Sequence, residues 1–351
     1  MTEDHRLRLA FAGLHPEQVE RLLSEGSARR ALAKVENGQI GSPVARAAAR
    51  VPADQRRREL ERLGITVVFR GGPGYPEALQ GRQNAPDSLF VRGSVAEGPA
   101  VAVVGTRRCT IYGRRLARSY GRAVAKAGWP LVSGLARGVD GAAHEGTVDV
   151  AGQGIAVLGS GIDVLYPAEH RALAQQLVDN GGAIVTEYPP GTPPEGWRFP
   201  PRNRIISGLS GAVVVVEATV KGGALITASA ALEQGIPVFS VPGDVDRDSS
   251  RGCNLLIRDG AHPVLDPDDL VEELELVLGP APRGRRRGGV PADVDLPNDV
   301  IAAIEGIGVG QSVDEFAARA GVDAVAALVL VGLLEANGLV CREGSLLTRA
   351  P

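Results

Sequence analysis

The sequence predicts an α/β fold for residues 65–280, a doubly wound parallel sheet. Short continuous apolar runs recur along this segment, stretches of helical length separate them, and glycine-rich turns follow most of the runs. A continuous apolar run is typical of a strand that is covered on both faces, and strands that alternate with helices form parallel sheets. We therefore expect a single doubly wound domain from about residue 66 to residue 275.

Six apolar runs mark the expected parallel strands. They are Val101–Val104, Leu131–Val132, Ile155–Leu158, Ala183–Thr186, Val213–Val216 and Val238–Val241. Helices are expected between them, over 112–127, 139–147, 168–179, 202–209 and 225–234. Two further short strands, 65–69 and 88–91, are bounded by Gly and Pro and precede the series.

Residues 1–64 predict a helical (SAM-like) domain without a convincing strand. Pro16 suits the first turn of a helix that continues through Val19 and Leu22. The stretch 44–63 contains six arginines. A helix of this kind can face DNA, but a solvated helix face is the commoner arrangement and is the interpretation that we favour.

Residues 281–293 predict a basic linker, and residues 294–351 predict a winged-helix domain. Helices are expected over 313–319 and 322–337, followed by a hairpin of 339–341 with 346–348. In a winged helix that reads DNA, the second helix offers Arg, Lys, Asn or Gln to the major groove. Here that helix contains no basic residue, which favours core packing or contact with another protein.

Composition limits the classes of protein that are expected. The formal net charge of the 351 residues is −3, so any surface for nucleic acid must be a local basic patch. The three cysteines lie far apart, which indicates neither a zinc site nor a disulfide framework. The charged N-terminus lacks an apolar signal region, and the longest apolar run, Ala324–Leu334, is too short to span a bilayer. We therefore expect a cytoplasmic protein without a membrane partner.

The strand-to-helix loops carry the features that predict a ligand. Right-handed crossovers place these loops at one edge of the sheet. Glycines in the loops let backbone N–H groups approach a phosphate, and helix N-termini add partial positive charge. Full positive charges join them at the same edge, and these are Arg107, Arg137, Arg202, Arg204 and Lys221. The convergence predicts a phosphorylated ligand.

Signatures of enzymes are missing from these loops. GTRRCTIYG stands where a dinucleotide fingerprint would be, and no P-loop occurs, so neither a nucleotide cofactor nor an ATPase is expected. His144 follows Asp140 by four residues, but a satisfied Asp–His contact or a helix cap by Asp140 is favoured over a general base. Glu187 and Glu217 end strands, where each can act in acid–base chemistry or bind backbone N–H groups or Arg204. Carboxylates for two metal ions are not clustered, so we expect no metal and no catalytic residue.

A series of ordered motifs resembles the DNA-processing protein A family (DprA, also called Smf). The motifs are VAVVGTRRCTIYG, SGLARGVDGAAH, AVLGSGIDVLYP, TEYPPGTPP, FPPRNRIISGLS, VVVVEATVKGGALITASAALEQG, VFSVPGD and GCNLLIRDGA. The resemblance covers roughly residues 101–261. It implies an extended Rossmann-like fold with a helical N-terminal domain and a winged helix at the C-terminus. It also implies binding of single-stranded DNA in a basic pocket, homodimerisation, and loading of the RecA recombinase during natural transformation.

The resemblance and the loops together name the residues expected to bind single-stranded DNA. They are Gly105, Thr106, Arg107, Gly134, Arg137, Phe199, Arg202, Asn203, Arg204, Lys221, Gly222 and Gly223. Phe199 is expected to stack on a base. Asn254 and Ile257 are expected at a dimer contact, with packing of their helix on the sheet as the alternative.

Two loops of the chain depart from the family pattern. Thr106 replaces a serine and keeps its hydroxyl, whereas 222–224 read Gly-Gly-Ala in place of Ser-Gly-Ser and lose both hydroxyls.

KGGALITASAALE loosely resembles the PGGxGTxxE motif of lysine-decarboxylase-like nucleotide hydrolases, although its spacing and the missing proline do not match. A nucleotide-processing hydrolase is therefore the alternative function. A transcription factor that reads DNA with its winged helix is disfavoured by the uncharged second helix.

Overall fold

The computed structural model describes residues 2–82, 84–280, 311–336, 340–343 and 346–349. It divides into two compact units, residues 1–282 and residues 283–351. Each unit has a hydrophobic core of its own. The predicted basic linker, residues 281–293, lies outside the described residues.

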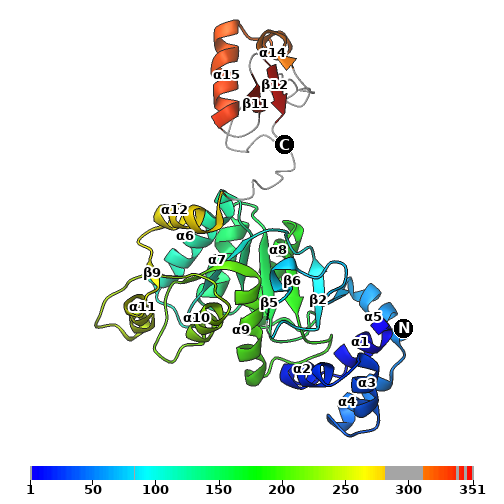
Figure 1. Ribbon diagram of the computed structural model, residues 1–351. Coiled ribbons are helices and arrows are strands. Elements are labelled where there is room, and N and C mark those ends of the chain that lie inside the picture. Colours follow the sequence, from blue (N-terminus) through cyan, green and yellow to red (C-terminus); the bar gives the residue numbers. More distant parts are fainter. Residues whose placement is uncertain (1, 83, 281–310, 337–339, 344–345, 350–351) are drawn as a thin grey trace. The chain divides into compact units, whose positions relative to one another are not determined.

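A nine-stranded sheet forms the centre of the first unit (Figure 1). Its strands in chain order are β1 (Thr66–Phe69), β2 (Ser88–Gly93), β3 (Ala100–Val104), β4 (Leu131–Ser133), β5 (Gly154–Leu158), β6 (Ala183–Thr186), β7 (Ser210–Val215), β8 (Val238–Ser240) and β9 (His262–Pro263). Their order across the sheet is β1-β2-β6-β5-β4-β3-β7-β8-β9. Strands β3 to β9 are mutually parallel, and β1 and β2 add to the β6 edge in antiparallel pairing. The six predicted parallel strands are thus confirmed.

Helices cover both faces of this sheet (Figure 1). They are α6 (Ile111–Ala127), α7 (Val139–Val148), α8 (Arg171–Asp179), α9 (Phe199–Gly208), α10 (Gly223–Glu233), α11 (Asp248–Arg258) and α12 (Pro267–Leu278). Side chains of α9, α10 and α11 pack on one face, and side chains of α6, α7, α8 and α12 pack on the other. Because both faces are covered, all five residues of β3 are buried, which explains its continuous apolar sequence AVAVV.

The strand order creates a switch point between β3 and β7. From β3 the chain proceeds through β4, β5 and β6 in one direction, and it then returns to place β7 on the other side of β3. In open α/β sheets, ligands bind beyond the carboxyl ends of the strands at such a point. The loops that follow β3 and β7 therefore define where a binding site is expected.

Five helices precede the sheet and lie beside its β2 end (Figure 1). They are α1 (Thr2–Ala10), α2 (Pro16–Ser24), α3 (Ala28–Glu36), α4 (Pro43–Arg50) and α5 (Ala53–Leu63). The Arg6 guanidinium holds them to the sheet, because it binds the Asp87 carboxylate at 2.6 Å and donates to the carbonyl oxygen of Arg70 at 3.0 Å. The rings of Phe11 and Phe90 meet edge to face at 5.4 Å between centroids. The helical character of these residues and the helix that begins at Pro16 are confirmed, whereas the expected stretch 44–63 forms two helices, because Pro52 separates α4 from α5. A boundary at residue 64 stays a prediction because these helices belong to the same compact unit as the sheet.

The described residues of the second unit, 311–336, 340–343 and 346–349, form two helices and a small sheet. Its elements are β10 (Gln311–Ser312), α14 (Val313–Ala320), α15 (Ala324–Ala336), β11 (Val340–Glu343) and β12 (Leu346–Arg349), and the strands pair in the order β10-β12-β11. The second helix begins two residues later than predicted because Asp323 accepts a hydrogen bond from the N–H of Ala326. The elements lie where the sequence predicts them, while their designation as a winged helix stays a prediction. Within the described part of the chain, no helix is long and apolar enough to cross a membrane.

Helices α6 and α7 pack closely because glycines face the opposing backbone. A Cβ atom at Gly121 of α6 would overlap the carbonyl oxygen of Ala143, and one at Gly146 of α7 would overlap that of Arg118. A backbone atom cannot move aside as the end of a flexible side chain can. The contact between the two helices therefore requires glycine at both positions.

We expect Gly121→Ala to lower the free energy of unfolding by at least about 1–3 kcal/mol, the usual effect of overpacking. Urea denaturation of the purified protein measures this change. Gly223→Ala is the matched control, because its Cβ meets nothing within 4 Å and alanine favours helix over glycine. Equal stability of Gly121→Ala and the unmodified protein would contradict the packing argument.

Candidate nucleic-acid interface

Three loops meet at the switch point. The N–H of Thr106, after β3, donates to the carbonyl oxygen of Glu217, after β7, at 2.7 Å. The N–H of Val139, at the start of α7, donates to the carbonyl oxygen of Thr106 at 3.2 Å. A Cβ atom at Gly105 would come within 2.5 Å of Val139 and 2.8 Å of the Glu217 oxygen. The predicted convergence of the loops after β3, β4 and β7 is thus confirmed.

Glycines in these loops are required by packing between the loops. Gly138 has a φ of +80°, and a Cβ atom there would overlap the carbonyl oxygen of Thr106. At Gly134 a Cβ atom would lie 2.6 Å from both the Arg202 guanidinium and the Asp140 carboxylate. From the sequence, these glycines were predicted to let backbone N–H groups approach a phosphate. The structure adds a reason that is independent of any ligand.

Arg202 lies in the interior, unlike an exposed phosphate contact. Its side chain is 4% exposed, and its Nη1 donates to the carbonyl oxygen of Gly134 at 2.8 Å and to that of Val157. Burial lowers the pKa of Arg202 to about 10, and the nearby Asp140 opposes this shift. Arg202 therefore connects the loop after β4 to strand β5 from below the surface.

A cluster of two exposed cations, one exposed ring and one half-buried ring lies over this buried arginine. The Arg107 guanidinium lies 4.5 Å from the ring centroid of Phe199, and the rings of Phe199 and Tyr166 lie 5.9 Å apart. The Arg137 guanidinium lies 5.7 Å from the Tyr166 ring and also pairs with Glu169. We call Arg107, Arg137, Tyr166 and Phe199 the rim cluster.

Tyr166 is the member of the rim cluster that sequence reasoning missed. Its side chain is 40% exposed although tyrosine is largely apolar. A signal was present, because aromatic residues make up 4% of the chain and Tyr166 lies in the loop after β5. A search for aromatic residues in the strand-to-helix loops would have found it, since rings at such edges can stack on bases.

The loop after β7 adds a cation and an uncapped helix. Lys221 is exposed, and among the described residues its side chain takes part in no ion pair. Helix α10 begins after Gly222 without a side-chain cap, so its first N–H groups lack that partner. The Asn203 amide donates to the carbonyl oxygen of Gly223 at 3.3 Å, which connects this loop to α9. Asn203 itself is buried.

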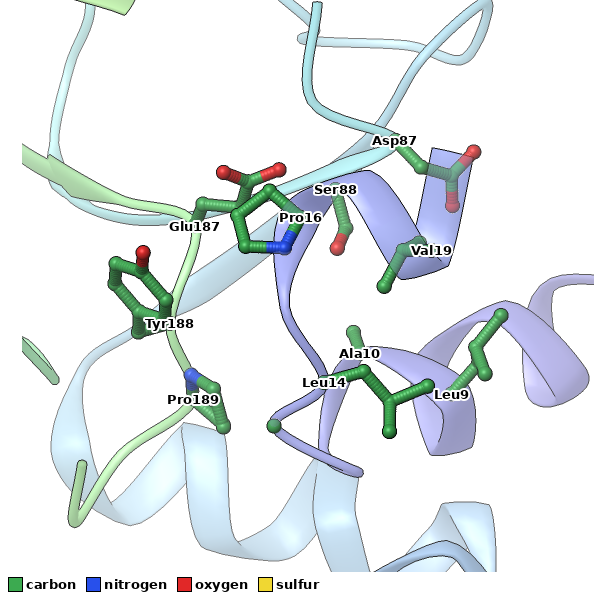
Figure 2. A pocket seen from close by; sticks show the side chains of 11 residues that line it. Leu9, Ala10, Leu14, Pro16, Val19, Asp87, Ser88, Glu187, Tyr188 and Pro189 are labelled. Atoms are coloured by element: carbon green, nitrogen blue, oxygen red, sulfur yellow. The ribbon is translucent and has the colours of Figure 1, made fainter. Parts of the chain in front are cut away.

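Arg204 lies away from the rim cluster, against the end of β6. Its Nη2 binds both carboxylate oxygens of Glu187, at 2.9 and 2.8 Å. Glu187 and Tyr188 line a small cavity together with residues of α1 and α2, among them Pro16 (Figure 2). The cavity volume is about 20 Å³, far below the several hundred Å³ of a typical ligand pocket. Arg204 is therefore paired with a residue that lines the boundary between the sheet and the N-terminal helices.

The candidate acid–base residues are engaged or buried. Glu217 accepts hydrogen bonds from the Thr110 N–H at 3.0 Å and the Thr110 hydroxyl at 3.2 Å. The expected Asp140–His144 contact is wrong, because Asp140 accepts from the Gly134 N–H at 3.1 Å instead. Nor does Asp140 cap α7. His144 is fully buried without a hydrogen-bond partner for either ring nitrogen, and burial lowers its pKa to about 3. In the described ranges, no group of three or more His, Cys, Asp or Glu residues is placed to hold a metal ion.

The two residues expected at a dimer contact lie on α11. The Asn254 side chain bonds the backbone of Gly243 in both directions, at 3.1 and 2.9 Å. Ile257 is half-buried. This arrangement orders the loop after β8, and a role of either residue between subunits stays a prediction.

Comparison with known proteins identifies the family. The family model for DNA recombination-mediator protein A matches residues 66–275, which is more than half of the chain. The chain belongs to this family. It is similar to the protein Smf of Escherichia coli, with 42% identity over 252 residues that cover 70% of this chain and 67% of that protein.

Two solved structures share this architecture. DNA processing protein A of Streptococcus pneumoniae matches with a TM-score of 0.64 and 32% identity, over 76% of this chain and 95% of that one. DNA processing protein A of Helicobacter pylori, whose single-stranded DNA binding mode has been described, matches with a TM-score of 0.53 and 26% identity, over 60% of this chain and 95% of that one. The Rossmann-like fold predicted from the sequence agrees with both.

We expect Arg202→Met to destabilise the protein by about 2–3 kcal/mol, because buried carbonyl oxygens lose hydrogen bonds to a charged donor. Arg107→Met is the matched control, since Arg107 is exposed and most surface substitutions change stability by at most about 0.5 kcal/mol. Urea denaturation measures both. Similar losses in the two variants would contradict the assignment of Arg202 to the interior framework.

Acid should destabilise the protein through His144. The folded-state pKa of about 3 lies below the usual 6.5, so the unfolded chain binds a proton that the folded chain does not between these values. Stability therefore falls as the pH falls from 7 to 5, by about 2 kcal/mol from this residue. The free energy of unfolding, measured as a function of pH, should fall less between pH 7 and pH 5 for His144→Leu than for the unmodified protein. Parallel curves for the two proteins would refute the prediction.

Proposed function

We propose that the protein binds single-stranded DNA across the carboxyl edge of the sheet and acts as a recombination mediator without catalysing a reaction. The observation that carries the proposal is the exposed Arg107 guanidinium over the half-buried Phe199 ring at the switch point. It combines a charge for phosphates with an aromatic face for bases. Proteins that bind single strands without sequence preference combine these two elements.

The interaction energies favour replacement of the Arg107 guanidinium by a DNA base on the face of the Phe199 ring. An exposed cation–π contact contributes about 0.5–1 kcal/mol, whereas a base stacked on an aromatic ring contributes about 1–3 kcal/mol. When a base covers the ring, the displaced guanidinium is free to bind the neighbouring phosphate. Arg107 and Phe199 then each gain a stronger partner than they have in the free protein.

Further contacts to phosphates surround this pair. Lys221 and the first N–H groups of α10 supply charge and donors beside β7. The ion pair of Arg137 with Glu169 is 54% and 51% exposed, and such surface pairs contribute little, so a phosphate can replace Glu169. Arg202, Asn203, Gly105, Thr106, Gly134, Gly222 and Gly223 we assign to the framework that shapes this edge. Arg204 we assign to the contact with the N-terminal helices.

The ionisable groups near the rim cluster support a role without catalysis, because they are either hydrogen-bonded to other residues or buried. The described contacts commit Glu187 to Arg204 and one oxygen of Glu217 to Thr110. His144 is buried and its low pKa keeps it neutral near pH 7. None of the three is therefore placed as a free general base at the rim.

The wider role follows from family membership. We infer loading of RecA onto incoming DNA during natural transformation, a cytoplasmic location, and a homodimer in which Asn254 and Ile257 of α11 lie near the contact. We also infer a winged-helix fold for the second unit, whose α15 contains no basic residue and is therefore better suited to a protein partner than to DNA.

Arg107→Ala and Phe199→Ala should each weaken binding of single-stranded oligonucleotides. Loss of the stack predicts a roughly 5- to 150-fold weaker Kd for Phe199→Ala. Loss of one phosphate contact should reduce the slope of log K against log salt by about 0.7 for Arg107→Ala. Fluorescence anisotropy over a salt series measures both, with duplex DNA of the same length as comparison. Equal affinity for the two forms of DNA, or unchanged binding by both variants, would overturn the proposal.

A further inference from the structure

Helix α6 carries an unusual concentration of positive charge. Its 17 residues contain no acidic side chain, although the whole chain has a net charge of −3. Its cations are Arg114, Arg115, Arg118, Arg122 and Lys126. The helix packs on the sheet through the opposite side, which consists of Gly113, Ala117, Tyr120, Gly121 and Val124.

Contacts with α7 account for two of these cations. Arg114 binds Glu145 at 2.7 Å, and Arg118 binds Asp149 at 2.7 Å. The remaining three, Arg115, Arg122 and Lys126, are exposed, and none of them forms an ion pair with any residue that the structure describes. Their spacings of seven and four residues place them on one face of the helix, about 10 Å and 6 Å apart along its axis.

The start of this face adjoins the rim cluster. Helix α6 follows Arg107 after three residues, and its first two side chains, Ile111 and Tyr112, are 92% and 50% exposed. The Arg115 guanidinium lies 5.6 Å from the Tyr112 ring centroid. The pairing of an exposed arginine with an aromatic ring, seen in Arg107 and the half-buried Phe199, is therefore repeated one helical turn into α6.

We propose that Tyr112, Arg115, Arg122 and Lys126, the α6 stripe, bind the flanking nucleotides of a single DNA strand whose central nucleotides occupy the rim cluster. The inference rests on the proposed function and extends it by a second subsite. Continuity with Arg107 and the exposed ring at its start distinguish the stripe from an ordinary solvated helix face. A polyanion that leaves the rim along α6 meets three cations without an acidic side chain of the same helix.

The test compares oligothymidylates of about six and about twenty nucleotides, lengths that bracket typical single-strand site sizes. The variant Arg115→Gln/Arg122→Gln/Lys126→Gln should bind the short oligonucleotide as the unmodified protein does. It should bind the long one at least about tenfold more weakly, with a salt slope smaller by about 2, or about 0.7 for each of three phosphates. Equal thermal midpoints verify that the variant is folded.

A matched control removes the same charge elsewhere. Arg29→Gln/Arg58→Gln/Arg62→Gln replaces three exposed arginines of the N-terminal helices that form no ion pair within the described ranges. This control should leave the affinity for both lengths within about twofold. Equal losses in both triple variants, or equal losses for both lengths in the α6 variant, would overturn the stripe as a separate subsite.

The experiment separates this inference from the function on which it rests. Full affinity of the α6 variant for the long oligonucleotide, together with weak binding of both lengths by Arg107→Ala, would overturn the stripe and leave the rim intact. Failure of the unmodified protein to bind either length would overturn the proposed function and this inference with it.

Discussion

Arg202 carries its charge below the carboxyl edge of the sheet, where a guanidinium is costly to bury unless its donors are used. Carbonyl oxygens after β4 and within β5 accept from it, and the Asn203 amide oxygen accepts from its Nε at 3.3 Å. Asn203 in turn reaches the loop after β7. The buried cation and its neighbour Asn203 thereby fix the relative positions of two loops and strand β5, which in turn position the side chains above them. The candidate interface depends on this interior framework more than on any surface contact.

The architecture could be predicted because the signals for it are local. Runs such as AVAVV are apolar throughout, since helices cover both faces of the sheet, and Pro16 marks a helix start by its fixed φ. The right-handed crossover then places all the loops at one edge. These rules predict which loops meet, and they led to Arg107 and Lys221 without knowledge of any coordinate, whereas Phe199 was found through the resemblance to a known family.

The direction of individual side chains could not be predicted in the same way. Arg202 and Arg204 are two residues apart in one motif, yet the first enters the interior and the second turns to Glu187. The difference depends on which carbonyl and carboxylate groups the neighbouring strands present, and those partners lie up to 68 residues away in sequence. Likewise, Asp140 and His144 are spaced so that they could meet on one face of a helix, yet they do not. The Asp140 carboxylate instead accepts a hydrogen bond from the N–H of Gly134 in the loop after β4.

The close contacts of the loop glycines have a consequence for how this fold diversifies. Gly105, Gly134 and Gly138 each face atoms that a methyl group would displace, so the inner layer of the edge tolerates little variation. Inherited changes in ligand preference must therefore accumulate in the outer layer, at positions such as 107, 166 and 221, where a side chain can be exchanged without moving the backbone. The fold thus separates a tightly packed inner layer from a few outer positions, whose side chains can change without movement of the backbone.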